Sequence, residues 1–158
     1  MGHRCNLVII ENSQVSVYYD HWAATILDIE LLWGAKIARE FIEERDVKPD
    51  SWLNDEWAEG GCVIDFDSKQ LLWYGGDNIL CAPELNLINH ELLEIQWAGW
   101  TIEWAKDGIF DLAKKAGVSI EVVSSNRQRG AENLVQPYVY ESEPVSYTHL
   151  TLPTIYSV

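Results

Sequence analysis

Two stretches in the first half of the chain show apolar runs broken by short polar turns, as β-hairpins do. Residues 5–11 and 15–19 are rich in β-branched and aromatic side chains, and an Asn-Ser-Gln turn separates them. Residues 61–74 repeat this arrangement around a Ser-Lys pair. The two stretches match at a constant offset that lays Val8 over Val63, which fits both a duplication and two unrelated hairpins. The pattern therefore predicts two β-hairpins.

Helical periodicity follows the first hairpin. Residues 28–45 are helical in composition, and the segment 35–45 is the more secure part because Gly34 interrupts the pattern. One apolar stripe of this segment consists of Ile37, Ala38, Phe41 and Ile42. The opposite side carries the charge pairs Lys36–Glu40 and Arg39–Glu43, each four residues apart.

A second helix is predicted over residues 84–97, where apolar residues are spaced for one helix face. These residues are Leu85, Ile88, Leu92 and Ile95. Residues 100–104 then alternate as a half-buried strand does, and a short helix is expected over 108–116. We expect three tryptophans of this region to lie in the core: Trp97, Trp100 and Trp104.

The element order β-β-α-β-β-α-β-α predicts an α+β fold. Two hairpins and one further strand would form an antiparallel or mixed sheet, with about three helices packed on one face. We expect one α+β domain over residues 1–123 and a loosely ordered polar segment over 124–143. Residues 144–158 hold no charged Asp, Glu, Lys or Arg and resemble a translated sequencing-adapter remnant, so they are predicted to be a non-native tail.

Charge narrows the possible partners. The 158-residue chain has 25 acidic and 11 basic residues, for a formal net charge of −14. Nucleic acids and anionic membranes require clustered Lys and Arg, so neither is expected as a partner, whereas a basic protein is. No apolar run is long enough to span a bilayer and no long apolar leader is present, so the expected compartment is the cytoplasm.

Aromatic residues supply the candidate binding surface. The chain has eight tryptophans, and Trp22, Trp52 and Trp57 occupy loop-like segments rich in carboxylates. Tryptophan is a frequent anchor of protein interfaces. The predicted binding residues are Trp22, Trp52, Trp57, Asp55, Glu56 and Glu59.

Candidate catalytic residues are few. Asp65 and Asp67 lie two apart on a predicted strand, where two carboxylates on one face could hold a divalent cation or divide acid and base roles. His21 could serve as a general base, although Asp20 is poorly placed to orient it. Turn and surface roles are the alternative for all three. No phosphate-binding, dinucleotide or nucleophile-elbow motif is present, so no cofactor and no metal are predicted.

Several short motifs resemble a bacterial family of small uncharacterised proteins that are acidic and rich in tryptophan. The chain opens with Gly2-His3-Arg4-x-Asn6 and continues with Tyr18-Tyr19-x-His21-Trp22-x-Ala24. The segments Glu59-Gly60-Gly61 and Tyr74-Gly75-Gly76 fit the same resemblance, which covers most of residues 2–117. It implies no activity and no catalytic residue.

These observations favour an acidic protein-binding module, such as an inhibitor or immunity-type partner of a basic protein. Two alternatives remain open. One is a small metal-assisted enzyme that uses Asp65 and Asp67, and the other is a binder of carbohydrate or another small ligand that uses the loop tryptophans.

Overall fold

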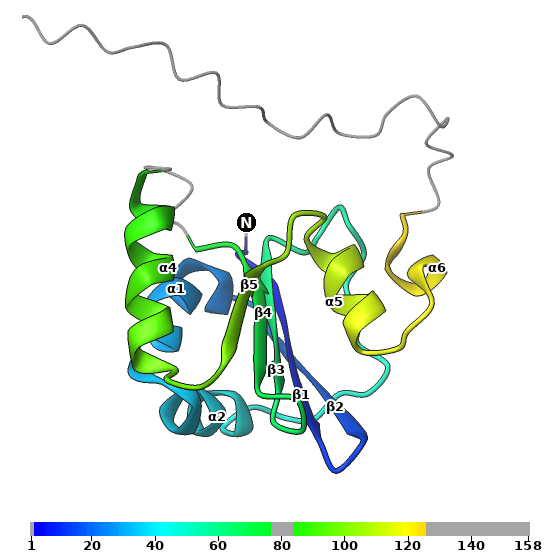
Figure 1. Cartoon of the computed structure of the whole chain (residues 1–158). Coiled ribbons are helices and arrows are strands. Elements are labelled where there is room, and N and C mark those ends of the chain that lie inside the picture. Colours follow the sequence, from blue (N-terminus) through cyan, green and yellow to red (C-terminus); the bar gives the residue numbers. More distant parts are fainter. Residues whose placement is uncertain (1, 77–83, 126–158) are drawn as a thin grey trace, which may run out of the picture. The chain divides into compact units, whose positions relative to one another are not determined.

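Five strands form one mixed sheet in the computed structural model, which describes residues 2–76 and 84–125 (Figure 1). The strands are β1 (Cys5–Glu11), β2 (Gln14–Asp20), β3 (Gly60–Asp65), β4 (Gln70–Tyr74) and β5 (Thr101–Trp104). Their order across the sheet is β2-β1-β3-β4-β5. Every described residue belongs to one compact unit, Met1–Arg127, and the predicted tail at 144–158 lies outside the described residues.

The strand pairing confirms the predicted hairpins and the mixed sheet. β1 pairs with β2 and β3 pairs with β4, both antiparallel. β1 and β3 pair in parallel, with Val8 opposite Val63, so the two hairpins lie side by side in the register of their sequence match. β5 joins in parallel to β4.

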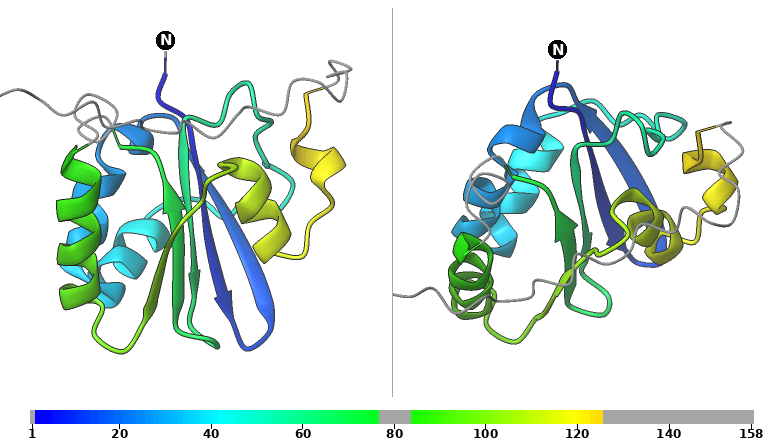
Figure 2. Two further views of the ribbon diagram at one scale, coloured as in Figure 1. Left: turned by 45° about the horizontal axis from the view of Figure 1, so that its top comes forward. Right: turned by 90° about the horizontal axis from the view of Figure 1, so that it is seen from above.

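Helices cover both faces of the sheet (Figures 1 and 2). One face carries η1 (Ala23–Thr25), α1 (Leu27–Glu30), η2 (Leu31–Trp33), α2 (Ala35–Glu43) and α4 (Glu84–Gln96). The other carries α5 (Ile109–Lys115) and α6 (Ile120–Val123). None of the helices in the described residues is long and apolar enough to cross a bilayer.

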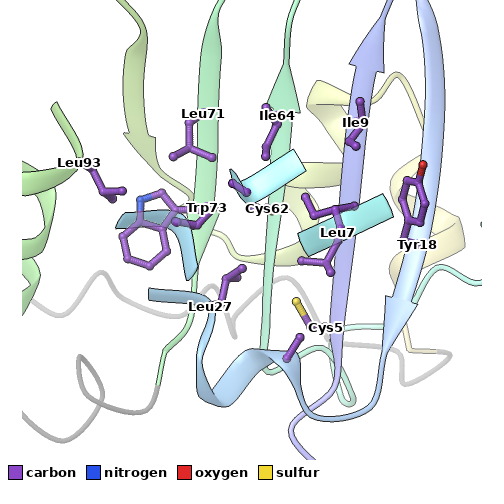
Figure 3. Packing of buried hydrophobic residues seen from close by; sticks show 14 of the residues in the cluster. Cys5, Leu7, Ile9, Tyr18, Leu27, Cys62, Ile64, Leu71, Trp73 and Leu93 are labelled. Atoms are coloured by element: carbon purple, nitrogen blue, oxygen red, sulfur yellow. The ribbon is translucent and has the colours of Figure 1, made fainter. Parts of the chain in front are cut away.

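The prediction that helices lie on one face is therefore wrong, and the central strands give the reason. β1 and β3 are buried almost throughout, so neither offers a polar side to solvent. Leu7 and Ile64 enter one core cluster together with Leu27 and Leu93, as Figure 3 shows. Their neighbours along the strands enter a second cluster on the opposite face, and its members include Val8, Val63, Ile109 and Leu112. A strand that is apolar on both sides needs a cover on both sides.

Helix α2 confirms part of the apolar stripe predicted for residues 35–45. Ala38 and Ile42 of α2 are fully buried, whereas Ile37 is exposed. The predicted charge pairs form, with Nζ of Lys36 3.9 Å from Oε1 of Glu40 and Nε of Arg39 2.8 Å from Oε1 of Glu43.

Helix α4 departs from the common rule that the apolar stripe of a helix faces the core. Its four stripe residues are all exposed: Leu85 (42%), Ile88 (54%), Leu92 (43%) and Ile95 (71%). Leu93 is the buried residue of α4. Two hydrogen bonds to the preceding helices fix this rotation. Nε1 of Trp97 donates to the carbonyl of Leu31 in η2 (2.8 Å), and Nδ2 of Asn89 donates to the carbonyl of Asp28 in α1 (3.5 Å).

The three tryptophans around β5 pack as predicted, although only one is fully enclosed. Trp97 is 1% exposed. Trp100 is partly buried and meets Trp97 edge to face, with ring centroids 5.0 Å apart. Trp104 is also partly buried and meets Trp73 in the same way at 4.9 Å.

One buried amide fastens the long loop between α2 and β3 to the sheet. Asn6 on β1 is fully buried. Its Nδ2 donates to the carbonyls of Tyr18 (3.3 Å) and Ser51 (3.0 Å), and its Oδ1 accepts from the backbone N–H of Leu53 (2.7 Å). Residues 51–53 are thereby held against the ends of β1 and β2.

We predict that Asn6→Ala destabilises the protein by about 2–3 kcal/mol, because the Leu53 N–H and two carbonyls lose their buried partner. Urea unfolding followed by tryptophan fluorescence measures this loss. The control Gln14→Ala, at an exposed position of β2, should change the unfolding free energy by no more than about 0.5 kcal/mol. An equally small effect of Asn6→Ala would contradict the fastening role.

Candidate functional site

An open cavity of about 460 Å³ lies at the end of the sheet where β1 and β3 begin. Three aromatic side chains line it: Tyr19 from the end of β2, and Trp52 and Trp57 from the long loop. Two of the three tryptophans that the sequence marks as binding residues therefore meet at one place. Trp57 is 54% exposed, whereas Trp52 is half-buried and packs against the second core cluster.

Backbone hydrogen bonds hold the loop at this end of the sheet. The N–H groups of Glu59 and Gly60 donate to the carbonyl of Arg4 at 3.0 and 3.3 Å, and the Arg4 N–H donates to Oε2 of Glu59 at 3.0 Å. Near the start of the loop, the Lys48 N–H donates to the carbonyl of Val17 at 2.8 Å. Together with Asn6, these bonds set the positions of Trp52 and Trp57.

The charges at the cavity are positive. The Arg4 guanidinium carbon lies 4.5 Å from the centroid of the Trp57 ring, and Lys48 Nζ lies 5.5 Å from that of Tyr19. Both distances fit cation–π contacts. None of the described Asp or Glu residues lines the cavity. The expected carboxylate-rich surroundings of these tryptophans are therefore absent from the cavity wall.

The acidic residues predicted for binding lie elsewhere. The Asp55 carboxylate accepts the Ser125 N–H at 2.7 Å and ties the loop to the segment after α6. Glu59 accepts the Arg4 N–H, and Glu56 is exposed. Trp22 is 55% exposed but belongs to a separate group, with ring centroids 5.1 Å from His21 and 6.2 Å from His3.

His21 has no orienting carboxylate among its observed contacts. Its Nδ1 lies 3.1 Å from the Tyr19 hydroxyl. Asp20 instead accepts the N–H groups of Trp22 and Ala23, both at 2.7 Å, and Nε of Arg45 at 2.6 Å. Burial by itself raises the pKa of Asp20, but these donors outweigh burial and lower that pKa below its ordinary value. Asp20 thus stabilises the turn after β2.

Asp65 and Asp67 lie at the opposite end of β1 from His21, because Asp65 pairs with Ile10 whereas Asp20 pairs with Cys5. Asp65 accepts Lys115 Nζ at 2.7 Å and the Ser68 hydroxyl at 2.6 Å. It also accepts the N–H groups of Asp67 and Ser68, both at 3.0 Å.

Asp67 binds a different partner, the turn of the first hairpin. Its two carboxylate oxygens accept the N–H groups of Asn12 and Ser13, each at 2.8 Å. Structural donors therefore occupy both carboxylates. The described residues contain no group of three or more His, Cys, Asp or Glu that could hold a metal ion.

Two of the cysteines are buried thiols. Burial raises the pKa of Cys5 well above its ordinary value and raises the pKa of Cys62 to about 12. Both side chains are fully enclosed and thus unsuited to act as nucleophiles. Cys81 lies outside the described residues.

A second candidate surface, which the sequence reasoning missed, is the outer face of α4. It carries five exposed apolar side chains: Leu85, Leu87, Ile88, Leu92 and Ile95. Trp33 of the adjoining η2 is 65% exposed. The charged residues of α4 are Glu84, Glu91 and Glu94, with no Lys or Arg, and His90 Nε2 lies 3.5 Å from Glu94 Oε1. The sequence carried one signal that could have indicated this surface, namely the absence of Lys and Arg from residues 84–96.

Comparison with known proteins found no match: no family model, no curated protein and no solved structure matches the chain. The resemblance to a bacterial family stays a prediction. The residues that carry it nevertheless meet in space, because Asn6 lies opposite both Tyr19 and Gly61, and Gly61 lies opposite Tyr74. They gather at the end of the sheet that holds the aromatic cavity.

We predict that the ionised Asp65 carboxylate, through its bonds to Lys115 and Ser68, contributes about 2 kcal/mol of stability that acid removes. Burial alone would raise the pKa of Asp65, but the Lys115 and Ser68 hydrogen bonds outweigh it and lower the pKa from 3.8 to about 2. Because the folded-state pKa is depressed, this stability is present above pH 3.8 and disappears as the pH falls through 2.

Urea unfolding of the wild type and Asp65→Asn at a series of pH values measures this contribution. The difference between the two proteins should be full at pH values well above 4 and shrink toward pH 2. Asp107→Asn, at an exposed position, is the control and should show no such trend. A difference that does not depend on pH would contradict the assignment.

Proposed function

We propose that this protein is an acidic protein-binding module that docks a basic amphipathic helix of a partner on the outer face of α4. The observation that supports the proposal is the exposed apolar seam Leu85, Ile88, Leu92 and Ile95. Contiguous apolar exposure of this kind marks interaction surfaces in soluble proteins.

The spacing of the seam indicates the shape of the partner. Successive residues are three, four and three positions apart, which is the a/d pattern of helices that pack lengthwise on one another. The seam points away from the sheet because Leu93 and Trp97 occupy the inner side. A second helix laid along α4 would therefore bury the seam without any rearrangement of the core.

The charges on α4 indicate the sign of the partner's charge. Glu84 and Glu91 each precede a seam residue and thus flank the seam, and Glu94 adds a third negative charge. A helix with Lys or Arg beside its apolar stripe complements this pattern. A second copy would bring the same glutamates and another −14 charge against the seam, so self-association is disfavoured.

The neighbouring elements extend the surface. Trp33 of η2 is 65% exposed and Ile29 of α1 is 44% exposed, and both elements belong to the helical layer that contains α4. An exposed tryptophan beside an apolar seam is the kind of side chain that becomes an interface anchor. The tryptophan loop is less suited to a basic partner, because Arg4 and Lys48 face its cavity.

We predict that Ile88→Gln combined with Ile95→Gln abolishes partner binding while the fold is retained, since both side chains are more than half exposed. Immobilised wild type should retain basic proteins from a lysate at low salt, and the double variant should lose them. Ile120→Gln combined with Val122→Gln is the matched control on α6, where the side chains are 58% and 54% exposed. This control should retain the same proteins as the wild type.

A synthetic helix tests the same surface with a known ligand. A peptide with Leu at a and d positions and Lys beside them should bind the wild type, and its affinity should fall as the Debye length shortens from about 30 Å at 0.01 M to about 8 Å at 0.15 M salt. A peptide with Glu in place of Lys should not bind. Equal binding of both peptides, or binding that survives the α4 substitutions, would overturn the proposal.

A further inference from the structure

We infer that the cavity formed by Tyr19, Trp52 and Trp57 binds a small planar aromatic molecule that carries a single negative charge. This site is independent of the docking face proposed on α4 and shares no residue with it. The inference rests on three properties of the cavity: aromatic walls, an all-positive charge set and a limited volume.

The walls are suited to a flat ring. Trp57 is 54% exposed and Trp52 is half-buried, and both belong to a loop that Asn6 and Arg4 hold in place through hydrogen bonds. The two indoles and the phenol that line the cavity provide apolar ring faces on which a flat ligand can stack. Ser51 adds a polar lining residue beside these rings.

The charge set selects an anion. Arg4 and Lys48 line the cavity, and none of the acidic residues within 2–76 and 84–125 does so. In a protein of net charge −14, two cations in a cavity whose described lining holds no Asp or Glu form a local positive site. Both cations lie over rings that line the cavity, so an anionic group on a ligand held by these rings would be close to a cation.

Size and total charge limit the ligand further. A volume of about 460 Å³ falls within the range of ligand sites, about 300–1,000 Å³, and has room for a molecule of one or two fused rings. A polyanion would meet the repulsion of the whole acidic chain, whereas one charge is compensated locally. An aromatic monocarboxylate fits all three properties.

A charge series on one ring system tests the inference by titration calorimetry of the full chain. Indole-3-acetate is the anion, indole is the neutral ring and tryptamine is the cation. The anion should bind at least about tenfold more tightly than tryptamine, which corresponds to about 1.4 kcal/mol, with indole between them. Glucuronate separates an aromatic requirement from a general preference for small acids, and it should bind more weakly than indole-3-acetate.

Variants locate the site. Arg4→Gln and Lys48→Gln should each weaken the binding of indole-3-acetate about fivefold, and Trp57→Ala should weaken it about tenfold or more. Lys36→Gln removes the same charge at an exposed position on α2 and should leave affinity unchanged. Lys48 and Trp57 are exposed, so their substitution should not alter the thermal midpoint.

Four outcomes would overturn the inference. They are no binding of indole-3-acetate at millimolar concentration, tryptamine binding as tightly as the anion, glucuronate binding as tightly as the aromatic acid, and affinity that ignores all three cavity substitutions.

Discussion

The parallel pairing of β1 with β3 is the constraint on which the rest of the structure depends. It places two hairpins side by side and buries the central strands on both faces, so each face must receive a helical cover. The loop between α2 and β3 must return to the start of β3, beside the start of β1. Asn6 completes this return because its buried amide binds the loop at Ser51 and Leu53. The same arrangement brings Trp52 and Trp57 to Tyr19, so the aromatic cavity is a direct consequence of how the two hairpins are joined.

The two candidate surfaces differ in charge, and this difference separates their roles. The net charge of −14 is unevenly placed: α4 carries glutamates and no Lys or Arg, whereas the described lining of the cavity holds Arg4 and Lys48 and no acid. A basic helix and a small aromatic anion would therefore prefer different sites on the same molecule. The two surfaces also arise differently. The surface on α4 exists because its apolar stripe faces away from the core, whereas the cavity is a gap between aromatic side chains that the hydrogen-bonded loop positions.

Local pattern predicted the elements well, and long-range contacts explain where prediction failed. The apolar runs and polar turns of residues 5–19 and 61–74 identified both hairpins, and the spacing of Leu85 to Ile95 identified α4 as a helix. The sequence could not predict which side of α4 faces the sheet, because bonds from Trp97 and Asn89 to distant carbonyls fix its rotation. Nor could it predict that Arg4 lies over Trp57, since these two residues are far apart along the chain. Asp65 and Asp67 looked like a pair for the same reason: their separate partners, Lys115 and the first hairpin turn, are remote in sequence.

The central claim is that this chain has two independent binding surfaces, and the indole N–H signals of its tryptophans test it most directly. In a ¹⁵N-labelled sample, the Lys-flanked peptide should shift the signal of Trp33 beside α4, whereas indole-3-acetate should shift those of Trp52 and Trp57. The signals of the buried Trp73 and Trp97 should stay fixed with both ligands, and either ligand should leave the shifts caused by the other unchanged. Both ligands shifting one common set of tryptophans, or both shifting the buried pair, would contradict the account.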